Sequence, residues 1–207
     1  MYPQLLPKDT ADLVTQFQAK QPQFLQNFYL SGGTGLSLQI GHRESEDLDF
    51  FSKEDFDPEL LQREVVTFGT LSNTELSRGT LNTFCQGVKL QFLHYPYQLI
   101  EPMVAWDEMH LSSILDIACT KLQTIAMRGS KKDFIDLFFL LKTYSLQDLF
   151  DALERKYVGI DYNKTHIMKS LTFFADAENQ PMPRMHSPVA WKSMKTSIID
   201  AIRSTKF

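Results

Sequence analysis

The chain has 207 residues and a mass of 23.9 kDa, enough for one domain or for a domain with an added helical lobe. Hydrophobic residues make up 43% of it and charged residues 22%, the composition of an ordinary soluble globular protein. Its 21 basic and 25 acidic side chains give a net charge of −4. That charge argues against a protein that coats nucleic acid or a membrane surface.

The two cysteines, Cys85 and Cys119, are far apart and have no metal-like spacing. We therefore expect neither a disulfide framework nor a zinc ribbon. We expect both thiols to be buried, in a protein of the reducing cytoplasm. The first residues carry no basic flank followed by a long apolar run, and no apolar stretch approaches the length of a bilayer-spanning helix. We expect a cytoplasmic protein that has no membrane partner.

In chain order, the first half alternates between helical and extended patterns. Asp9 and Thr10 are typical of the start of a helix that ends near Lys20. The segments that follow are a strand over 28–30, a short helix over 36–40 ended by Gly41, a strand over 47–51 and a helix over 58–68. Apolar residues then alternate with polar ones over 81–85 and 88–93, on both sides of Gln86-Gly87, which predicts an antiparallel hairpin.

The second half reads as helical. The expected helices cover 113–127, a segment capped by Ser130 with Asp133 in a capping-box-like position, 145–156, 164–174 and 189–204, with a proline-rich loop at 177–188. The sequence thus predicts an α+β fold in two parts. Residues 1–105 form a mixed sheet with helices, and residues 106–207 form a helical part that packs against it.

The most informative segment joins a glycine turn to a pair of acids. The run Ser31-Gly32-Gly33-Thr34 follows a strand and opens a helix, where main-chain N–H groups can approach an anion closely. Arg43 adds a planar set of donors suited to phosphate. Asp47 and Asp49 are two apart on a strand, so they share one face and offer oxygen ligands to Mg²⁺. Taken alone, the two glycines would indicate only a turn, and the charged residues only a solvated surface. Taken together in this order, they indicate a nucleotide-binding site.

This segment resembles the nucleotidyltransferase fold, and more narrowly the AbiEii/AbiGii family of abortive-infection toxins. The resemblance covers about residues 28–141, and a second motif lies over 115–137. There the family carries a Lys on a helix, an Arg-Gly-x-Lys-Lys-Asp break and a second Asp. The matching positions here are Lys121, Arg128, Lys131, Lys132, Asp133 and Asp136.

The resemblance implies a Mg²⁺-dependent enzyme that moves a nucleotidyl group from a nucleoside triphosphate (NTP) to an RNA, such as the 3′ end of tRNA, or to a protein. It also implies a separately encoded antitoxin. The expected catalytic residues are Asp47, Asp49, Lys121, Asp133 and Asp136, of which Asp47 and Asp49 also hold the metal. The expected nucleotide-binding residues are Ser31, Gly32, Gly33, Thr34, Arg43, Arg128 and Lys132. From the residues alone, Lys121 is a lone cation on an apolar helix, so it needs a partner or must reach the surface.

One position departs from the pattern of the nucleotidyltransferase fold. In that fold, a strand after the Asp-x-Asp strand often carries a third carboxylate. Gln91 stands where that acid is expected, and an amide can neither carry the charge nor act as a base. Three explanations remain open: the third acid is Asp133 or Asp136, two carboxylates suffice for the metal, or the protein is a catalytically degenerate module that binds nucleotide or a protein partner.

Overall fold

The computed structural model describes residues 1–205, and the chain divides into two compact units after Ser113. The first unit contains a sheet flanked by helices. Its helical elements are η1 (Pro3–Leu5), α1 (Lys8–Lys20), α2 (Phe24–Asn27), α3 (Gly32–Ile40), α4 (Pro58–Val65) and η2 (Val66–Phe68). Its strands are β1 (Tyr29–Leu30), β2 (Leu48–Ser52), β3 (Leu71–Ser77), β4 (Thr80–Cys85), β5 (Val88–His94), β6 (Val104–Trp106) and β7 (Met109–Leu111).

The seven strands form one mixed sheet in the order β3-β4-β5-β2-β1-β7-β6. β2 pairs in parallel with β5 and antiparallel with β1, while β1 pairs in parallel with β7. The predicted hairpin is confirmed as β4 and β5, and its turn places Gln86 and Gly87 at φ angles of 53° and 81°. Positive φ at both central residues matches the right-handed twist of the strands. The strands β6 and β7 are too short to leave a period-two pattern, and the sequence did not predict them.

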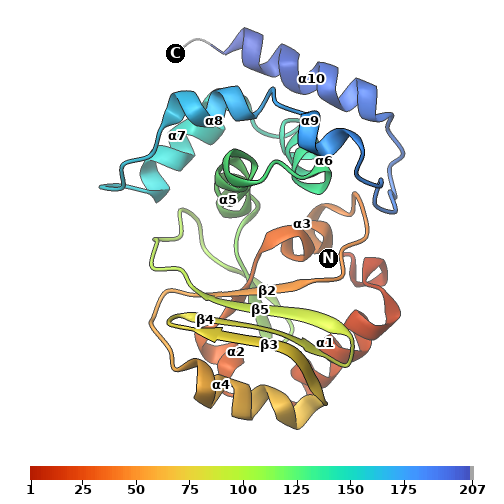
Figure 1. Ribbon diagram of the computed structural model, residues 1–207, viewed down its shortest axis with the longest axis vertical. Helices are drawn as coiled ribbons and strands as arrows, with labels where there is room; N and C mark the ends of the chain where they lie inside the picture. Colours follow the sequence, from red (N-terminus) through yellow and green to blue (C-terminus); the bar gives the residue numbers. More distant parts are fainter. Residues whose placement is uncertain (206–207) are drawn as a thin grey trace. The chain divides into compact units, whose positions relative to one another are not determined.

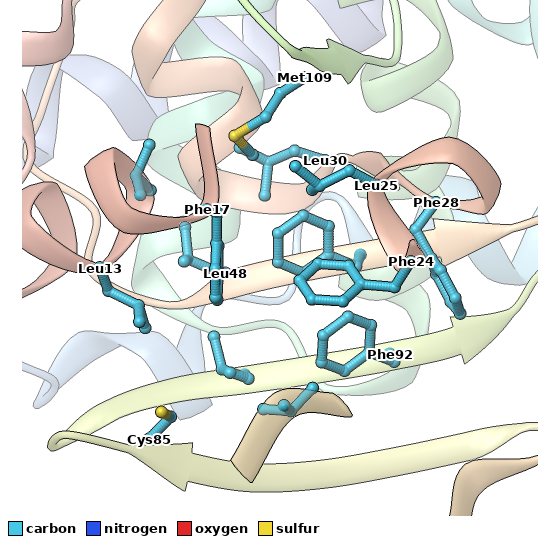
Figure 2. Close-up of a cluster of buried hydrophobic side chains, with 14 of the residues drawn as sticks. Leu13, Phe17, Phe24, Leu25, Phe28, Leu30, Leu48, Cys85, Phe92 and Met109 are labelled. Atoms are coloured by element: carbon cyan, nitrogen blue, oxygen red, sulfur yellow. The ribbon is translucent and has the colours of Figure 1, made fainter. Parts of the chain in front are cut away.

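In the core of the first unit, phenylalanine rings from helices and strands pack against one another among leucine side chains (Figure 2). Phe50 of β2 and Phe92 of β5 are stacked with ring centroids 5.0 Å apart. Phe17 of α1 meets Phe24 of α2 edge to face at 5.2 Å. Helices α2 and α4 are drawn below the sheet strands in Figure 1, and buried residues of α1, α2 and α4 belong to this same core. Because one face of the sheet packs against this core, polar side chains can lie on its other face.

The second unit is helical. Its elements are α5 (Ile114–Met127), α6 (Lys131–Leu140), α7 (Leu146–Lys156), α8 (Lys164–Ser170), α9 (Ala175–Glu178) and α10 (Trp191–Ser204). Ser145 and Asp148 form a full capping box at the start of α7. Two expectations need correction: the helix that begins at Lys164 ends at Ser170 rather than near 174, and a separate short helix, α9, extends into the expected loop. Among the described residues, no helix is long and apolar enough to cross a membrane.

The expected cap of α6 is also different. Ser130 is the N-cap residue, but its hydroxyl accepts no main-chain hydrogen bond. It donates instead to the Asp133 carboxylate at 2.6 Å. The prediction of a capping-box-like arrangement is therefore wrong, because the Asp133 carboxylate binds side chains instead of capping the helix.

Candidate nucleotide site

The first turn of α3 lies directly against the carboxylate of Asp49. Gly32 has a φ of +63°, a region that suits glycine, and a Cβ atom placed there would lie 2.0 Å from Oδ2 of Asp49. The main-chain N–H of Ser31 donates to the carbonyl of Asp49 at 2.8 Å, which extends the pairing of β1 with β2. Position 32 thus requires glycine for two reasons. Its φ angle is positive, and the Asp49 carboxylate leaves no room for a Cβ atom.

The next glycine receives the guanidinium group of Arg43. A Cβ atom on Gly33 would lie 2.6 Å from Nη2 of Arg43. Arg43 is buried, and its Nη1 donates to the carbonyl of Glu44 at 2.8 Å. Two adjacent glycines therefore bring a carboxylate and a guanidinium group to the start of one helix, where the first main-chain N–H groups have no partner within the helix.

The hydroxyl groups of Thr34 and Ser31 form hydrogen bonds that hold this turn in place. The Thr34 hydroxyl donates to the main-chain carbonyl of Asp47 and lies 2.9 Å from the hydroxyl of Ser45. It thereby ties α3 to the residue that immediately precedes β2. The buried Ser31 hydroxyl accepts a hydrogen bond from Ser112 at 2.8 Å. Sequence reasoning did not single out Ser45 or Ser112, because nothing near them in the chain marks them as part of the turn.

The register of the sheet places Gln91 beside Asp49. In the parallel pair of β2 and β5, Asp49 lies opposite Gln91. Val88, Leu90 and Phe92 are buried in the core, and the residues between them are half-buried. A neutral amide therefore occupies the position next to Asp49. Within residues 1–205, no three His, Cys, Asp or Glu side chains gather closely enough to make a metal site by themselves.

Three of the predicted site residues in the second unit, Lys121, Asp133 and Asp136, form a buried charge cluster. The Lys121 ammonium contacts Asp133 at 2.9 Å and Asp136 at 2.6 Å, and both carboxylates are fully buried. Arg128 adds a contact from Nε to Asp133 at 3.1 Å. Burial acts to raise the pKa of the Asp133 carboxyl, but the charges of Lys121 and Arg128 and the hydrogen bonds from Arg128 and Ser130 outweigh it. The net effect lowers this pKa below its usual value.

Two neighbouring cations in α6 have different surroundings. Lys132 is exposed, whereas Lys131 is buried and its ammonium group donates to the carbonyls of Glu178, at 3.0 Å, and Gln180. The structure also holds a buried pair that the sequence analysis missed, Lys156 with Asp116 at 2.6 Å between α7 and α5. No local spacing predicts this pair, since its members are 40 residues apart.

Comparison with known proteins identifies the family. The model of the AbiEii nucleotidyl transferase toxin of type IV toxin–antitoxin systems matches residues 17–97 and 94–206. The uncharacterized protein aq_aa25 of Aquifex aeolicus (strain VF5) is 37% identical over 160 residues, which are 74% of this chain and 77% of that protein.

Two solved structures are similar in fold. MenT4, a nucleotidyltransferase toxin from Mycobacterium tuberculosis H37Rv, has a TM-score of 0.56 and 15% identity, with 96% of this chain and 85% of that chain covered. JHP933 from Helicobacter pylori has a TM-score of 0.53 and 18% identity, with 96% and 92% covered. These likenesses confirm the predicted α+β nucleotidyltransferase fold, and the family match over most of the length shows that the chain belongs to the AbiEii nucleotidyltransferase toxin family.

Proposed function

We propose that this nucleotidyltransferase moves a nucleotidyl group from an NTP to a hydroxyl of an RNA or protein acceptor, in a reaction that requires Mg²⁺. The observation that carries the proposal is the pair of contacts at the start of α3, with Asp49 on Gly32 and Arg43 on Gly33. A carboxylate and a guanidinium group at a helix start suit a metal-bound triphosphate, because the anion is met by main-chain N–H groups and by a fixed cation.

The donor set of the first unit fits a magnesium ion. Asp49 supplies a carboxylate at the glycine turn, and Asp47, held through its main chain by Thr34, supplies the second. Mg²⁺ is commonly held by one or two carboxylates together with phosphate oxygens. When bound, the ion would neutralise charge at the α-phosphate.

The protein groups have separate roles in this proposal. The main-chain N–H groups of the half-buried Gly32 and Gly33 bind phosphate oxygens, Thr34 holds the turn in place, and Arg43 balances the negative charge that develops there. As the acceptor oxygen bonds to the α-phosphorus, the bond to pyrophosphate breaks and the hydroxyl proton is released. Lys121, Asp133 and Asp136 remain proposed catalytic residues, and Arg128 and Lys132 proposed nucleotide ligands, as the family motif implies. The family likewise supports a separately encoded antitoxin as the partner.

The test is a comparison of wild-type protein with Asp47→Asn and with Asp12→Asn, which changes an exposed acid of α1. We expect Mg²⁺-dependent thermal stabilisation by an NTP in the wild-type protein, because a ligand that binds only the native state raises its stability. We also expect label to pass from an α-labelled NTP to cellular RNA or protein, with loss of transfer in Asp47→Asn and unchanged transfer in Asp12→Asn. Full transfer by Asp47→Asn would remove this residue from the metal site.

The second candidate function is a degenerate nucleotide-binding module, and the observation that favours it is the neutral Gln91 beside Asp49. Stabilisation by an NTP without transfer to any cellular acceptor would establish that alternative.

A further inference from the structure

Polar side chains form a straight row across four neighbouring strands, beginning at Asp49. Gln91 lies opposite Asp49, Asn82 lies opposite Gln91, and Glu75 lies opposite Asn82. Neighbouring strands are about 4.8 Å apart, so these four residues span roughly 14 Å. We call Gln91 and Asn82 the amide pair. It is enclosed by a carboxylate at each end of the row.

The amide pair lies on the face of the sheet opposite the core. The residues that alternate with it, Leu81, Thr83, Leu90 and Phe92, are buried, whereas Asn82 and Gln91 are half-buried. The Oδ1 atom of Asn82 is buried and has no hydrogen-bond partner among residues 1–205. A buried acceptor without a donor costs free energy, and that cost is removed when a ligand supplies the donor.

The chemistry of the row selects its ligand. Asp49 is proposed to hold the metal at one end of the row, and the Glu75 carboxylate at the other end repels phosphate. Between them, each amide offers donors and an acceptor to an uncharged polar group. Phe84 and Lys89 lie opposite each other in the adjacent row and share the parity of Asn82 and Gln91. An aromatic ring can stack on a base, and amides can pair with base edges or ribose hydroxyls.

We propose that the amide pair, Gln91 and Asn82, is a nucleoside-binding subsite that continues from Asp49 along the sheet. The inference rests on the proposed function, because Asp49 is taken there as a ligand of the metal-bound triphosphate. The nucleoside belongs either to the NTP or to the terminal residue of an RNA acceptor, and the two sources share the same ribose and base chemistry.

The experiment measures binding by calorimetry in the presence of Mg²⁺ to wild-type protein and to Asn82→Ala, Gln91→Ala and Gln62→Ala. Gln62 is a half-buried amide on α4, on the core side of the sheet, and is the matched control. The ligands are ATP, GTP, CTP, UTP, inorganic tripolyphosphate and short single-stranded RNA of random sequence with a free 3′ hydroxyl. Each substitution in the amide pair should weaken binding about three- to tenfold, the effect of one lost hydrogen bond, and Gln62→Ala should not.

The pattern of loss identifies the source of the nucleoside. Weaker NTP binding with unchanged tripolyphosphate binding assigns the subsite to the NTP, and weaker RNA binding with unchanged NTP binding assigns it to the acceptor. The melting temperature of Asn82→Ala should not fall below the wild-type value, because the substitution removes an unsatisfied buried acceptor, whereas the loss of a purely structural Asn82 would lower it. Unchanged affinity for every ligand in both variants overturns the inference. If NTP binding is retained and Asp47→Asn still abolishes transfer, the proposed function survives that result, whereas a wild-type protein that binds no NTP refutes both.

Discussion

Replacement of Gly32 by alanine is a sharp test of the contact between the glycine turn and Asp49. The backbone at position 32 has a φ of +63°, which costs an L-residue such as alanine about 1–2 kcal/mol. The new methyl group would also lie 2.0 Å from Oδ2 and 2.9 Å from Cγ of Asp49. Overpacking of this kind adds about 1–3 kcal/mol. The free energy of unfolding should therefore fall by about 2–5 kcal/mol.

Gly87 provides a control that separates the two costs. It has a φ of +81°, and a Cβ atom there would meet nothing within 4 Å, so Gly87→Ala carries the backbone cost alone. Urea unfolding should show a larger loss for Gly32→Ala than for Gly87→Ala, and addition of Asp49→Ala to Gly32→Ala should recover part of the difference. Equal losses for the two glycine variants, or no recovery in the double variant, would refute the placement of Asp49 on the turn.

Three further predictions concern charged groups. Gln91→Asp should tighten Mg²⁺ binding without nucleotide in calorimetry, because it adds a carboxylate beside Asp49; unchanged affinity would mean that position 91 does not face the metal. Lys121→Met should lower the free energy of unfolding by about 3–5 kcal/mol in urea, since it leaves Asp133 and Asp136 buried without their shared cation, and a loss below that of Gly87→Ala would contradict this. Because the pKa of Asp133 is lowered in the folded protein, its contribution to stability is present above its unfolded pKa near 3.9 and is lost as the pH falls through the folded value. The stability difference between wild-type protein and Asp133→Asn should accordingly shrink below about pH 4, and a constant difference across that range would count against the ion pair.

The parts of the site that sequence could predict are those fixed by local geometry. The glycine turn, the strand that carries Asp49 and the Val88–His94 strand each follow from spacing within a few residues, although Asp47 lies just before its strand instead of on it. The alternation over 88–93 also predicts which residues of that strand are buried. The pairing of Asp49 with Gln91 on neighbouring strands places the amide where the nucleotidyltransferase fold often has its third acid.

The parts that sequence could not predict depend on contacts between distant residues. A pattern on α5 indicates that Lys121 needs a partner, but only the packing of α5 with α6 shows that it has two. The same packing takes Asp133 away from the cap of its own helix, which a local rule assigned to it. Arg43 stands in a polar segment that looks solvated, yet it is among the largest fully buried side chains.

The pairing of β1 with β7 has a consequence for the order of assembly during synthesis. Ser31, the residue before the glycine turn, receives its hydrogen bond from Ser112, which is 81 residues later in the chain. Contacts of such long sequence separation form slowly, because the intervening chain must first be closed into a loop. A ribosome-bound chain that ends before Met109 lacks β7, the strand that pairs with β1. The glycine turn therefore acquires its final frame only after the whole first unit has left the ribosome.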